Sequence, residues 1–454
     1  MTRTQTARSR ISPGTREARL LGGLVLLAAA LRFATLGVQS LDPDEAFTAE
    51  IARKSLGGAM SQIPSTESTP PLYYALLWVW AKVFGTGEWG LRSLSALAGS
   101  ALVPVVYATG AALRSRRVGL IAAAFVAVSP LLVWYSQEAR AYSLYALLAA
   151  LSFLFFVRGR LGWWALASAA ALATHYFAAV IVVPEALWLL WVHRRRAALA
   201  VTGVALTACA LAPLLIHQAG HVSRPWADAL SVKDELLATS QSFLVGLTWT
   251  WLIHRPGVIV LGLLALGMAW RARKHREALL PAALAAFGLV APFVASLFGA
   301  KYFTPGNELA VWPLIAVVLA MGASRRLAAA FCAGMLAITL AVPFDTSLQR
   351  ENWRDLVHGL HGPRGIVVLN GFEDTRVVRY YLRHPAPPHP VAEIAVLGRP
   401  GEAGYAFVLP PLAGMRRIAT LTSHKIAAAR YAGAPALVPA HAYRRKQTGT
   451  LYQR

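Results

Sequence analysis

The chain has 454 residues, of which 56% are hydrophobic and 14% charged, and its mean hydropathy is +0.49. A soluble domain of this length needs a more polar surface, so the composition excludes that class and predicts a polytopic membrane protein. The formal net charge of +23 would suggest nucleic-acid binding in a soluble protein. Here most Lys and Arg residues form short clusters between apolar runs, which reports membrane topology and indicates no nucleic-acid partner.

Residues 1–19 are basic and polar and are expected to form a cytoplasmic tail. The apolar run at 20–38 is too long for the core of a signal peptide and contains Arg32. We therefore expect it to be a first membrane-spanning helix that is not cleaved off. Basic clusters separate the later apolar runs, and the positive-inside rule places all of them in the cytoplasm and the intervening loops outside. These clusters are 114–117, 158–160, 193–196, 271–276 and 325–326.

Residues 70–85 form an apolar run that we do not expect to span the membrane. Counting it as a span would move every later loop to the opposite side of the membrane and would place the basic clusters outside. The run is also short and begins at Pro70-Pro71. We therefore predict an in-plane helix on the outer face, with similar helices at 44–60 and 236–252. The sequence then predicts about eleven spanning helices. They are 20–38, 90–112, 118–135, 141–157, 161–176, 178–192, 197–216, 257–270, 279–298, 308–322 and 327–343.

The composition changes after the last of these runs, and residues 344–454 contain no spanning segment. The pattern predicts strands at 365–370, 391–397 and 405–409, a helix at 373–383 and a Pro-rich turn at 385–390. We expect a small α/β domain on the outer side of the membrane. The predicted organisation is thus a tail (1–19), a transmembrane domain (20–343) and this C-terminal domain.

Four carboxylates follow the first predicted helix: Asp42, Asp44, Glu45 and Glu50, in a chain with 21 acidic and 44 basic residues. One interpretation is structural, because acidic residues cap and favour the first turn of a helix. The other is chemical, because a carboxylate can act as a general base toward an acceptor hydroxyl. The spacing alone does not separate the two for Asp44 and Glu45.

Further ionisable residues fall in the same outer loops, and each has a plain structural interpretation beside the functional one. Glu67 is either a loop acid or a ligand for a hard divalent cation. Glu138 and Arg140 are either a loop ion pair or, for Arg140, a phosphate ligand. His175 ends a helix on that face, and a lone His there is more often structural.

Lys301 and Tyr302 lie in the loop before residues 308–322, where a Lys can bind a lipid headgroup or a substrate phosphate. Arg32 and Glu185 lie near the middle of apolar helices, where an ionisable group usually finds a partner, so we predict that they pair. The chain has no Walker loop, dinucleotide fingerprint or HExxH motif, which argues against a soluble nucleotide donor.

An ordered set of motifs resembles the GT-C glycosyltransferases, and most of all the branch that contains protein O-mannosyltransferases and aminoarabinose lipid A transferases. The resemblance covers residues 20 to about 360. The motifs are Phe33…Leu36…Leu41-Asp-Pro-Asp-Glu-Ala46, Glu67-x-x-Pro-Pro-Leu-Tyr-Tyr74, Trp89-x-x-Arg92, Ser136-Gln-Glu-Ala-Arg-Ala-Tyr142, Lys301-Tyr302 and Asn352-Trp353-Arg354.

The resemblance implies a multi-pass enzyme of the bacterial plasma membrane that transfers a sugar, mannose or arabinose, with inversion on the outer face. It implies a polyprenyl-phosphate-sugar donor and a lipid, glycan or protein acceptor. Asp44 would be the catalytic base and Glu45 its support. Glu67 and Glu138 would be further carboxylates for the acceptor, and Glu67 would also be the ligand of a divalent cation. Lys301, Tyr302, Arg140 and His175 would bind the donor phosphate.

Two other functions compete with the enzyme. A transporter or flippase of a lipid-linked substrate predicts inverted repeats and polar groups along broken midplane helices. A membrane scaffold would use its outer domain to bind a partner. The ionisable groups of this chain are concentrated at one face, which favours surface chemistry.

Overall fold

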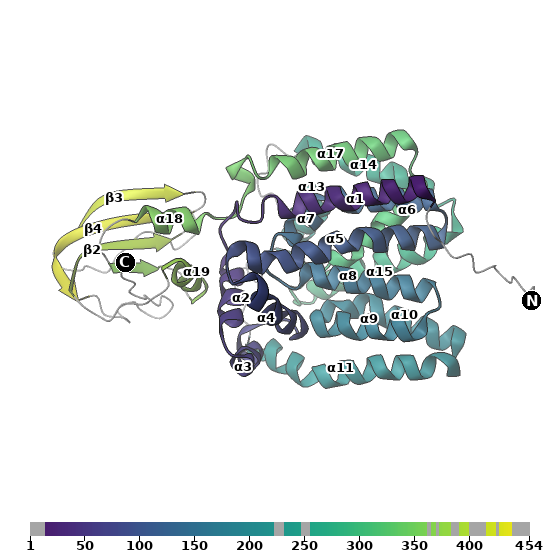
Figure 1. The fold of residues 1–454 in the computed structure, drawn as a ribbon, viewed down its shortest axis with the longest axis horizontal. Coiled ribbons are helices and arrows are strands. Elements are labelled where there is room, and N and C mark those ends of the chain that lie inside the picture. The colour runs from purple at the N-terminus through teal and green to yellow at the C-terminus, as the bar shows by residue number, and fades with distance from the viewer. Residues whose placement is uncertain are drawn as a thin grey trace, which may run out of the picture.

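The computed structural model describes residues 14–221, 231–246, 255–360, 365–368, 372–382, 390–398, 415–423 and 426–437. Long helices run side by side in a bundle, and the strands lie beyond one end of it (Figure 1). The bundle helices are α1 (Thr15–Phe33), α5 (Glu88–Leu113), α6 (Arg116–Val128), α7 (Pro130–Ser136), α8 (Tyr142–Val157), α9 (Leu161–Thr174), η1 (Tyr176–Ala178), α10 (Ala179–His193), α11 (Arg195–His221), α13 (Val232–Val245), α14 (Arg255–Ala272), η2 (Arg276–Ala278), α15 (Leu279–Leu297), η3 (Leu309–Val311), α16 (Trp312–Gly322) and α17 (Arg325–Ala341).

Each segment that the sequence predicts to span coincides with helical structure in this bundle. The segment predicted at 118–135 is two helices, α6 and α7, bent by 58° where Ser129 and Pro130 interrupt the backbone hydrogen bonding. Among the described residues, four helices are long and apolar enough to cross a membrane, or five if the bent pair counts as one span. Shorter apolar helices complete the bundle, so the mainly α, multi-pass architecture is confirmed.

Three short helices gather at the end of the bundle that faces the strands: α2 (Pro43–Arg53), α3 (Leu56–Thr66) and α4 (Leu72–Phe84) (Figure 1). The segment expected as one helix at 44–60 is two, because Ser55 caps a new helix by accepting a hydrogen bond from the Gly58 amide at 3.2 Å. α13 accounts for the predicted helix at 236–252 as far as Val245, and residues 247–252 lie outside the described residues.

The C-terminal part contains η4 (Thr346–Leu348), α18 (Trp353–Gly359), α19 (Phe372–Leu382) and the strands β1 (Gly365–Val368), β2 (Pro390–Gly398), β3 (Arg416–Ser423) and β4 (Ile426–Leu437). The sheet order is β1-β2-β4-β3, with β1 parallel to β2 and the other pairs antiparallel. β1, β2 and α19 match the predicted strands and helix, whereas β3, β4 and α18 were not predicted. The strand predicted at 405–409 and residues 385–389 of the predicted turn lie outside the described residues.

The predicted pairing of Arg32 with Glu185 is wrong. Arg32 is fully buried and donates to the Ser136 hydroxyl and to the carbonyls of Ala28, Val126 and Ala127. Glu185 instead accepts hydrogen bonds from the Ser152 hydroxyl at 2.5 Å and the Trp164 indole at 2.8 Å. Each group thus has its own hydrogen-bond partners: hydroxyl and carbonyl acceptors for Arg32, and hydroxyl and indole donors for Glu185.

The packing of α16 on α14 generates a test of the bundle. A Cβ atom on Gly322 would lie 1.8 Å from the Met268 carbonyl oxygen, whereas one on Gly267 would meet nothing within 4 Å. We expect Gly322→Ala to lower the free energy of unfolding by about 1–3 kcal/mol, because the two backbones must separate. Gly267→Ala should leave it unchanged or raise it by about 0.5–1 kcal/mol. Thermal unfolding of the two detergent-solubilised variants measures the difference, and equal melting temperatures would contradict the packing.

Candidate functional site

The sequence Asp42-Pro-Asp-Glu45 builds the start of α2 as a capping box. The Asp42 carboxylate accepts from the Glu45 amide at 2.8 Å, and the Glu45 carboxylate accepts from the Asp42 amide at 3.3 Å. Pro43 occupies the first helical position, where its missing N–H costs nothing. Asp44 and Glu45 therefore leave a rigid helix in different directions: the Asp44 side chain is 59% exposed, and the Glu45 side chain is fully buried.

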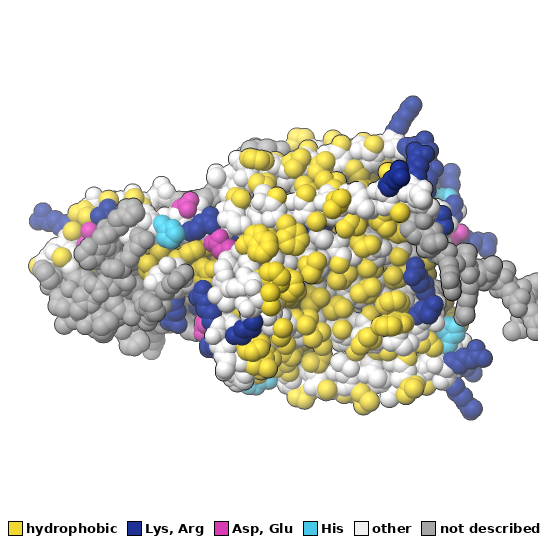
Figure 2. All heavy atoms as spheres, viewed as in Figure 1, with side chains coloured by type: hydrophobic (Ala, Val, Ile, Leu, Met, Phe, Trp, Pro, Cys, Tyr) yellow, Lys and Arg dark blue, Asp and Glu magenta, His cyan; other side chains and the backbone are white. Residues whose placement is uncertain are grey.

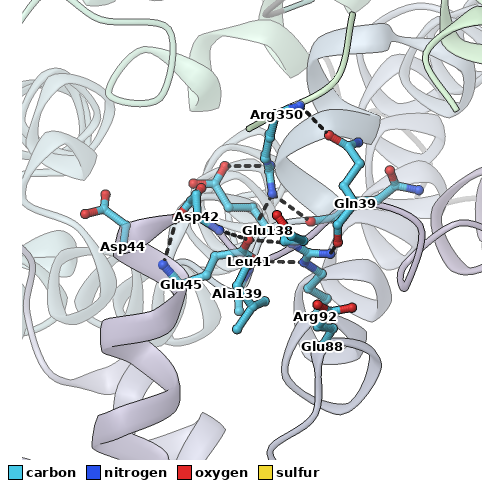
Figure 3. Close-up of polar contacts among 12 residues, drawn as sticks. Gln39, Leu41, Asp42, Asp44, Glu45, Glu88, Arg92, Glu138, Ala139 and Arg350 are labelled. Atoms are coloured by element: carbon cyan, nitrogen blue, oxygen red, sulfur yellow. Dashed lines mark hydrogen bonds and ion pairs between the residues drawn. The ribbon is translucent and has the colours of Figure 1, made fainter. Parts of the chain in front are cut away.

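Glu45 lies at the centre of a buried hydrogen-bonded network (Figure 3). Arg92 on α5 binds both of its carboxylate oxygens, with Nε–Oε1 at 2.7 Å and Nη2–Oε2 at 2.5 Å. The Ala139 amide and the Arg350 guanidinium also donate to it, at 2.8 and 3.1 Å. Burial alone would raise the pKa of Glu45, but Arg92 and then Arg350 outweigh it and hold that pKa below its usual range. Glu45 is thus an ionised structural anchor with its lone pairs occupied.

Arg92 uses its other donors to fix the connection between α1 and α2. Its Nη1 donates to the carbonyls of Leu36 and Gln39, and its Nη2 to the carbonyl of Ser40, all at 2.7–2.8 Å. All five guanidinium N–H groups therefore have partners, which is the full capacity of this side chain. The loop that places Asp44 is held to the start of α5 by one residue.

Arg350 lies between η4 and α18 and belongs to the same hydrogen-bonded network, although it is far from Glu45 and Arg92 in the sequence. Its guanidinium donates to the Glu138 carboxylate at 3.3 Å and to the Gln137 carbonyl at 3.3 Å. Glu138 therefore pairs with Arg350, and the alternative of an ion pair with Arg140 inside the loop is not what the structure has. Burial raises the pKa of Glu138, with Arg350 acting in the opposite direction.

A cavity of about 890 Å³ opens beside α2. Its walls come from α2, the α3–α4 and α7–α8 connections, the region of η1, the end of α11, the α15–η3 loop and α19. Six of the residues that the sequence singles out line it, whereas Glu45 and Glu138 do not. The six are Asp44, Glu67, Arg140, His175, Lys301 and Tyr302.

Arg140 bridges two carboxylates at the cavity wall. Its Nη1 donates to Glu67 Oε1 at 2.9 Å, and its Nη2 lies 3.8 Å from Asp44 Oδ2. Glu67 is 2% exposed, and burial raises its pKa while Arg140 opposes that rise. Glu67 thus holds Arg140 from behind, and the exposed Asp44 carboxylate faces the cavity.

His175 and Lys301 are also fixed by their surroundings. The His175 ring stacks on Tyr145 at a centroid distance of 4.6 Å, and its Nδ1 accepts from the Phe177 amide at 3.3 Å, which assigns the proton of the neutral ring to Nε2. The Lys301 Nζ lies 3.2 Å from Oε1 of Glu235, a buried residue of α13. The Tyr302 carbonyl accepts from the Asn307 side chain at 2.6 Å.

The residues around Glu67 do not fit a divalent cation. The Glu67 carboxylate already has a cationic partner, because it forms an ion pair with the Arg140 guanidinium. Within the described ranges, no group of three or more His, Cys, Asp and Glu side chains is arranged to hold a metal ion. The expected metal-ligand role of Glu67 therefore has no support in this geometry, and its contact with Arg140 accounts for its position.

Sequence reasoning missed three residues of this region: Arg350, Glu235 and Arg376 of α19, which also lines the cavity. The motif that carries the resemblance contained Arg92 without assigning it a role. Arg350 could have been selected from the sequence, because it is a basic residue that follows the last predicted spanning helix on the outer side, where the candidate carboxylates also lie.

The Glu45–Arg92 pair generates a prediction about stability. Glu45→Gln leaves the buried Arg92 without its counter-ion and should lower the free energy of unfolding by about 3–5 kcal/mol near neutral pH. The contribution of Glu45 is present above the unfolded pKa and is lost as pH falls through its lower folded pKa. The stability gap between the wild type and Glu45→Gln should therefore narrow below about pH 4.5.

The matched control is Glu50→Gln on the same helix, because Glu50 forms a partly exposed ion pair with Lys54 at 3.2 Å. Its loss should cost less than about 1 kcal/mol. Thermal unfolding of the three proteins between pH 3.5 and pH 7.5 gives both results. Equal shifts for the two variants would refute the anchoring role of Glu45.

Comparisons with known proteins agree with this architecture. Residues 68–217 match the family model of dolichyl-phosphate-mannose-protein mannosyltransferases. ArnT from Cupriavidus metallidurans bound to undecaprenyl phosphate has a TM-score of 0.56 and 16% sequence identity, covering 92% of this chain and 98% of that chain. The same protein in the apo state has a TM-score of 0.59 and 14% identity over the same shares.

The Archaeoglobus fulgidus oligosaccharyltransferase complex with Zn and sulfate has a TM-score of 0.45 and 15% identity, covering 81% of this chain and 57% of that chain. Among curated protein sequences, none matches the chain significantly. At these identities the likeness to ArnT establishes the fold, and the family model matches a segment that includes Glu138, Arg140 and His175. The comparisons thus show that the chain has the fold of ArnT and contains a segment similar to the mannosyltransferase family.

Proposed function

We propose that the chain transfers a sugar from a polyprenyl-phosphate-sugar donor to a hydroxyl of a lipid, glycan or protein acceptor, with Asp44 as the general base. The observation that carries the proposal is the composition of one cavity wall: an exposed carboxylate on a rigid helix, together with Arg140, Lys301 and His175. A base and several groups that bind phosphate are the two requirements of this reaction.

The chemistry needs no general acid. Asp44 takes the proton of the acceptor hydroxyl, the acceptor oxygen forms a bond to the anomeric carbon, and the bond from that carbon to the phosphate oxygen breaks. The polyprenyl phosphate leaves with the bonding electrons, and a single displacement inverts the anomeric centre. Lys301, Arg140 and the N–H of His175 are positioned in the same cavity to stabilise the phosphate that is released.

The choice of donor is supported by the fold neighbour that binds undecaprenyl phosphate and by the mannosyltransferase description of the family model. Mannose is the sugar that the family description names, and an arabinose-like pentose is the other sugar that the motif resemblance implies. The size of the cavity, about 890 Å³, is compatible with a sugar phosphate and an acceptor group present together.

We also propose that the cavity lies on the outer face of a bacterial plasma membrane. Lys and Arg side chains gather at the end of the bundle opposite the strands (Figure 2). The 114–117, 193–196 and 271–276 clusters, which connect bundle helices, contain exposed basic residues. The positive-inside rule then places the N-terminus in the cytoplasm and residues 344–454 outside as a separate domain. This arrangement brings lipid-linked donor and envelope acceptor to the same side.

Asp44→Asn tests the base. The substitution removes the proton acceptor, so we expect sugar transfer to fall by about 10²–10⁴-fold or more while the protein folds normally. The matched control is Asp42→Asn two residues earlier, because Asn is an equally good helix cap and Asp42 does not line the cavity. Mass spectrometry of membrane lipids and envelope glycans from a deletion strain carrying each variant measures transfer. Unchanged transfer in Asp44→Asn would remove the catalytic assignment.

Lys301 tests the site of the donor phosphate. Lys301→Met removes one cation from the cavity and should raise the KM for the lipid-linked donor about tenfold or more. Lys301→Arg keeps the charge and the ion pair with Glu235 and should stay close to the wild type. Lys82→Met is the control, because Lys82 lies over the Trp78 ring and away from the cavity. A donor KM that is the same in all four proteins would exclude Lys301 from donor binding.

A further inference from the structure

The C-terminal part of the chain contributes directly to the wall of the cavity through α19. Val377 and Val378 are fully buried in a hydrophobic cluster that includes Phe47 and Ala46 of α2. The Tyr381 hydroxyl accepts a hydrogen bond from the Leu41 amide at 2.8 Å. Helix α19 is therefore anchored on the base-bearing helix and on the loop before it.

Arg376 of α19 lines the cavity. Its Cζ atom lies 4.0 Å from the centroid of the Phe47 ring. Phe47 lies three residues after Asp44, which is one turn of α2, so both side chains occupy neighbouring positions on the same helix. The Arg376 guanidinium thus contacts the side chain that follows the proposed base by one helical turn, and both Arg376 and Asp44 line the cavity.

The position of Arg376 differs from those of the other cavity cations. Arg140 is bridged to Asp44 and Glu67, and Lys301 lies in the loop before η3. Arg376 instead approaches from the C-terminal side, over the helix that carries Asp44. A guanidinium stacked on an aromatic face is held in place, and its planar fork of donors matches phosphate or carboxylate oxygens.

We propose that Arg376 binds an anionic group, a phosphate or a carboxylate, on the acceptor molecule and so positions its hydroxyl against Asp44. This inference rests on the proposed function and assigns the C-terminal domain a part in acceptor selection. The donor phosphate and the acceptor anion then have separate cationic partners, Lys301 with Arg140 for the first and Arg376 for the second.

The test uses the full-length protein reconstituted in lipid nanodiscs. A membrane extract from a deletion strain supplies the accumulated lipid-linked sugar and the unmodified acceptor. Four proteins are compared: wild type, Arg376→Gln, Arg376→Lys and the control Arg379→Gln, which removes an exposed charge from the same helix outside the cavity. The KM for acceptor and the KM for donor are measured separately, and the reaction product is analysed by anion-exchange chromatography with and without phosphatase.

We expect Arg376→Gln to raise the acceptor KM about tenfold to a hundredfold, with the donor KM and kcat close to wild type. Arg376→Lys should recover part of the loss, and Arg379→Gln should behave as the wild type. The product should be anionic, and its sensitivity to phosphatase distinguishes a phosphate from a carboxylate.

Three results would overturn the assignment of Arg376. The first is an unchanged acceptor KM, and the second is a neutral product. The third is a loss of activity in which kcat and the melting temperature fall together and Arg376→Lys recovers neither. This third result would indicate that Arg376 has a structural role. A wild-type protein that transfers no sugar at all would instead refute the proposed function, and the assignment with it.

Discussion

The buried ion pair between Glu45 and Arg92 is the interaction on which the rest of the site depends. Arg92 joins the α1–α2 connection to α5, and Glu45 adds the Ala139 amide and Arg350 to the same cluster. Taking two charges out of water is costly, and such a pair often contributes little net stability. Its value here is geometric, because every donor of Arg92 is used and the pair therefore permits one arrangement of four chain segments. Removal of either partner leaves a buried charge without compensation.

This constraint explains how two adjacent carboxylates come to have different roles. Successive residues of a helix point about 100° apart, so an anchor at Glu45 forces Asp44 toward the cavity. A second pair repeats the arrangement at the cavity wall, where the buried Glu67 fixes Arg140 and Arg140 reaches Asp44. The proposed base thus stands on a helix whose cap, first turn and neighbouring cation are all held by other buried residues. Preorganisation of this kind lets a site stabilise a transition state without rearranging during the reaction.

The sequence predicted the bundle well because charge and hydropathy are local signals in a membrane protein. Loop charge, with the short length of the run and its Pro70-Pro71 start, placed α4 among the short helices at one end, and six of the eight selected residues line one cavity. What could not be predicted depends on contacts between distant segments. Arg350 and Arg376 reach the site from beyond residue 343. Arg32 bonds to a hydroxyl and to backbone carbonyls, and Glu185 bonds to a hydroxyl and an indole, and no charge pattern reveals these partners. β4 was missed because its Ala-rich sequence contains a single β-branched residue, Ile426, whereas such residues are typical of a strand.

The contacts of Arg140 suggest how base and leaving group are coupled in the proposed reaction. In the structure as it stands, Arg140 faces Glu67 at 2.9 Å and Asp44 at 3.8 Å. Transfer of the acceptor proton neutralises Asp44 and removes one of the two carboxylates near Arg140. At the same moment the departing phosphate gains negative charge, so the attraction of Arg140 for the phosphate increases as the reaction proceeds. An interaction that is stronger in the transition state than in the bound substrates lowers the barrier, whereas uniform binding does not. Arg140 is therefore better placed to assist catalysis than to contribute ground-state affinity, and Lys301, whose partner Glu235 takes no part in the proton transfer, is better placed for affinity.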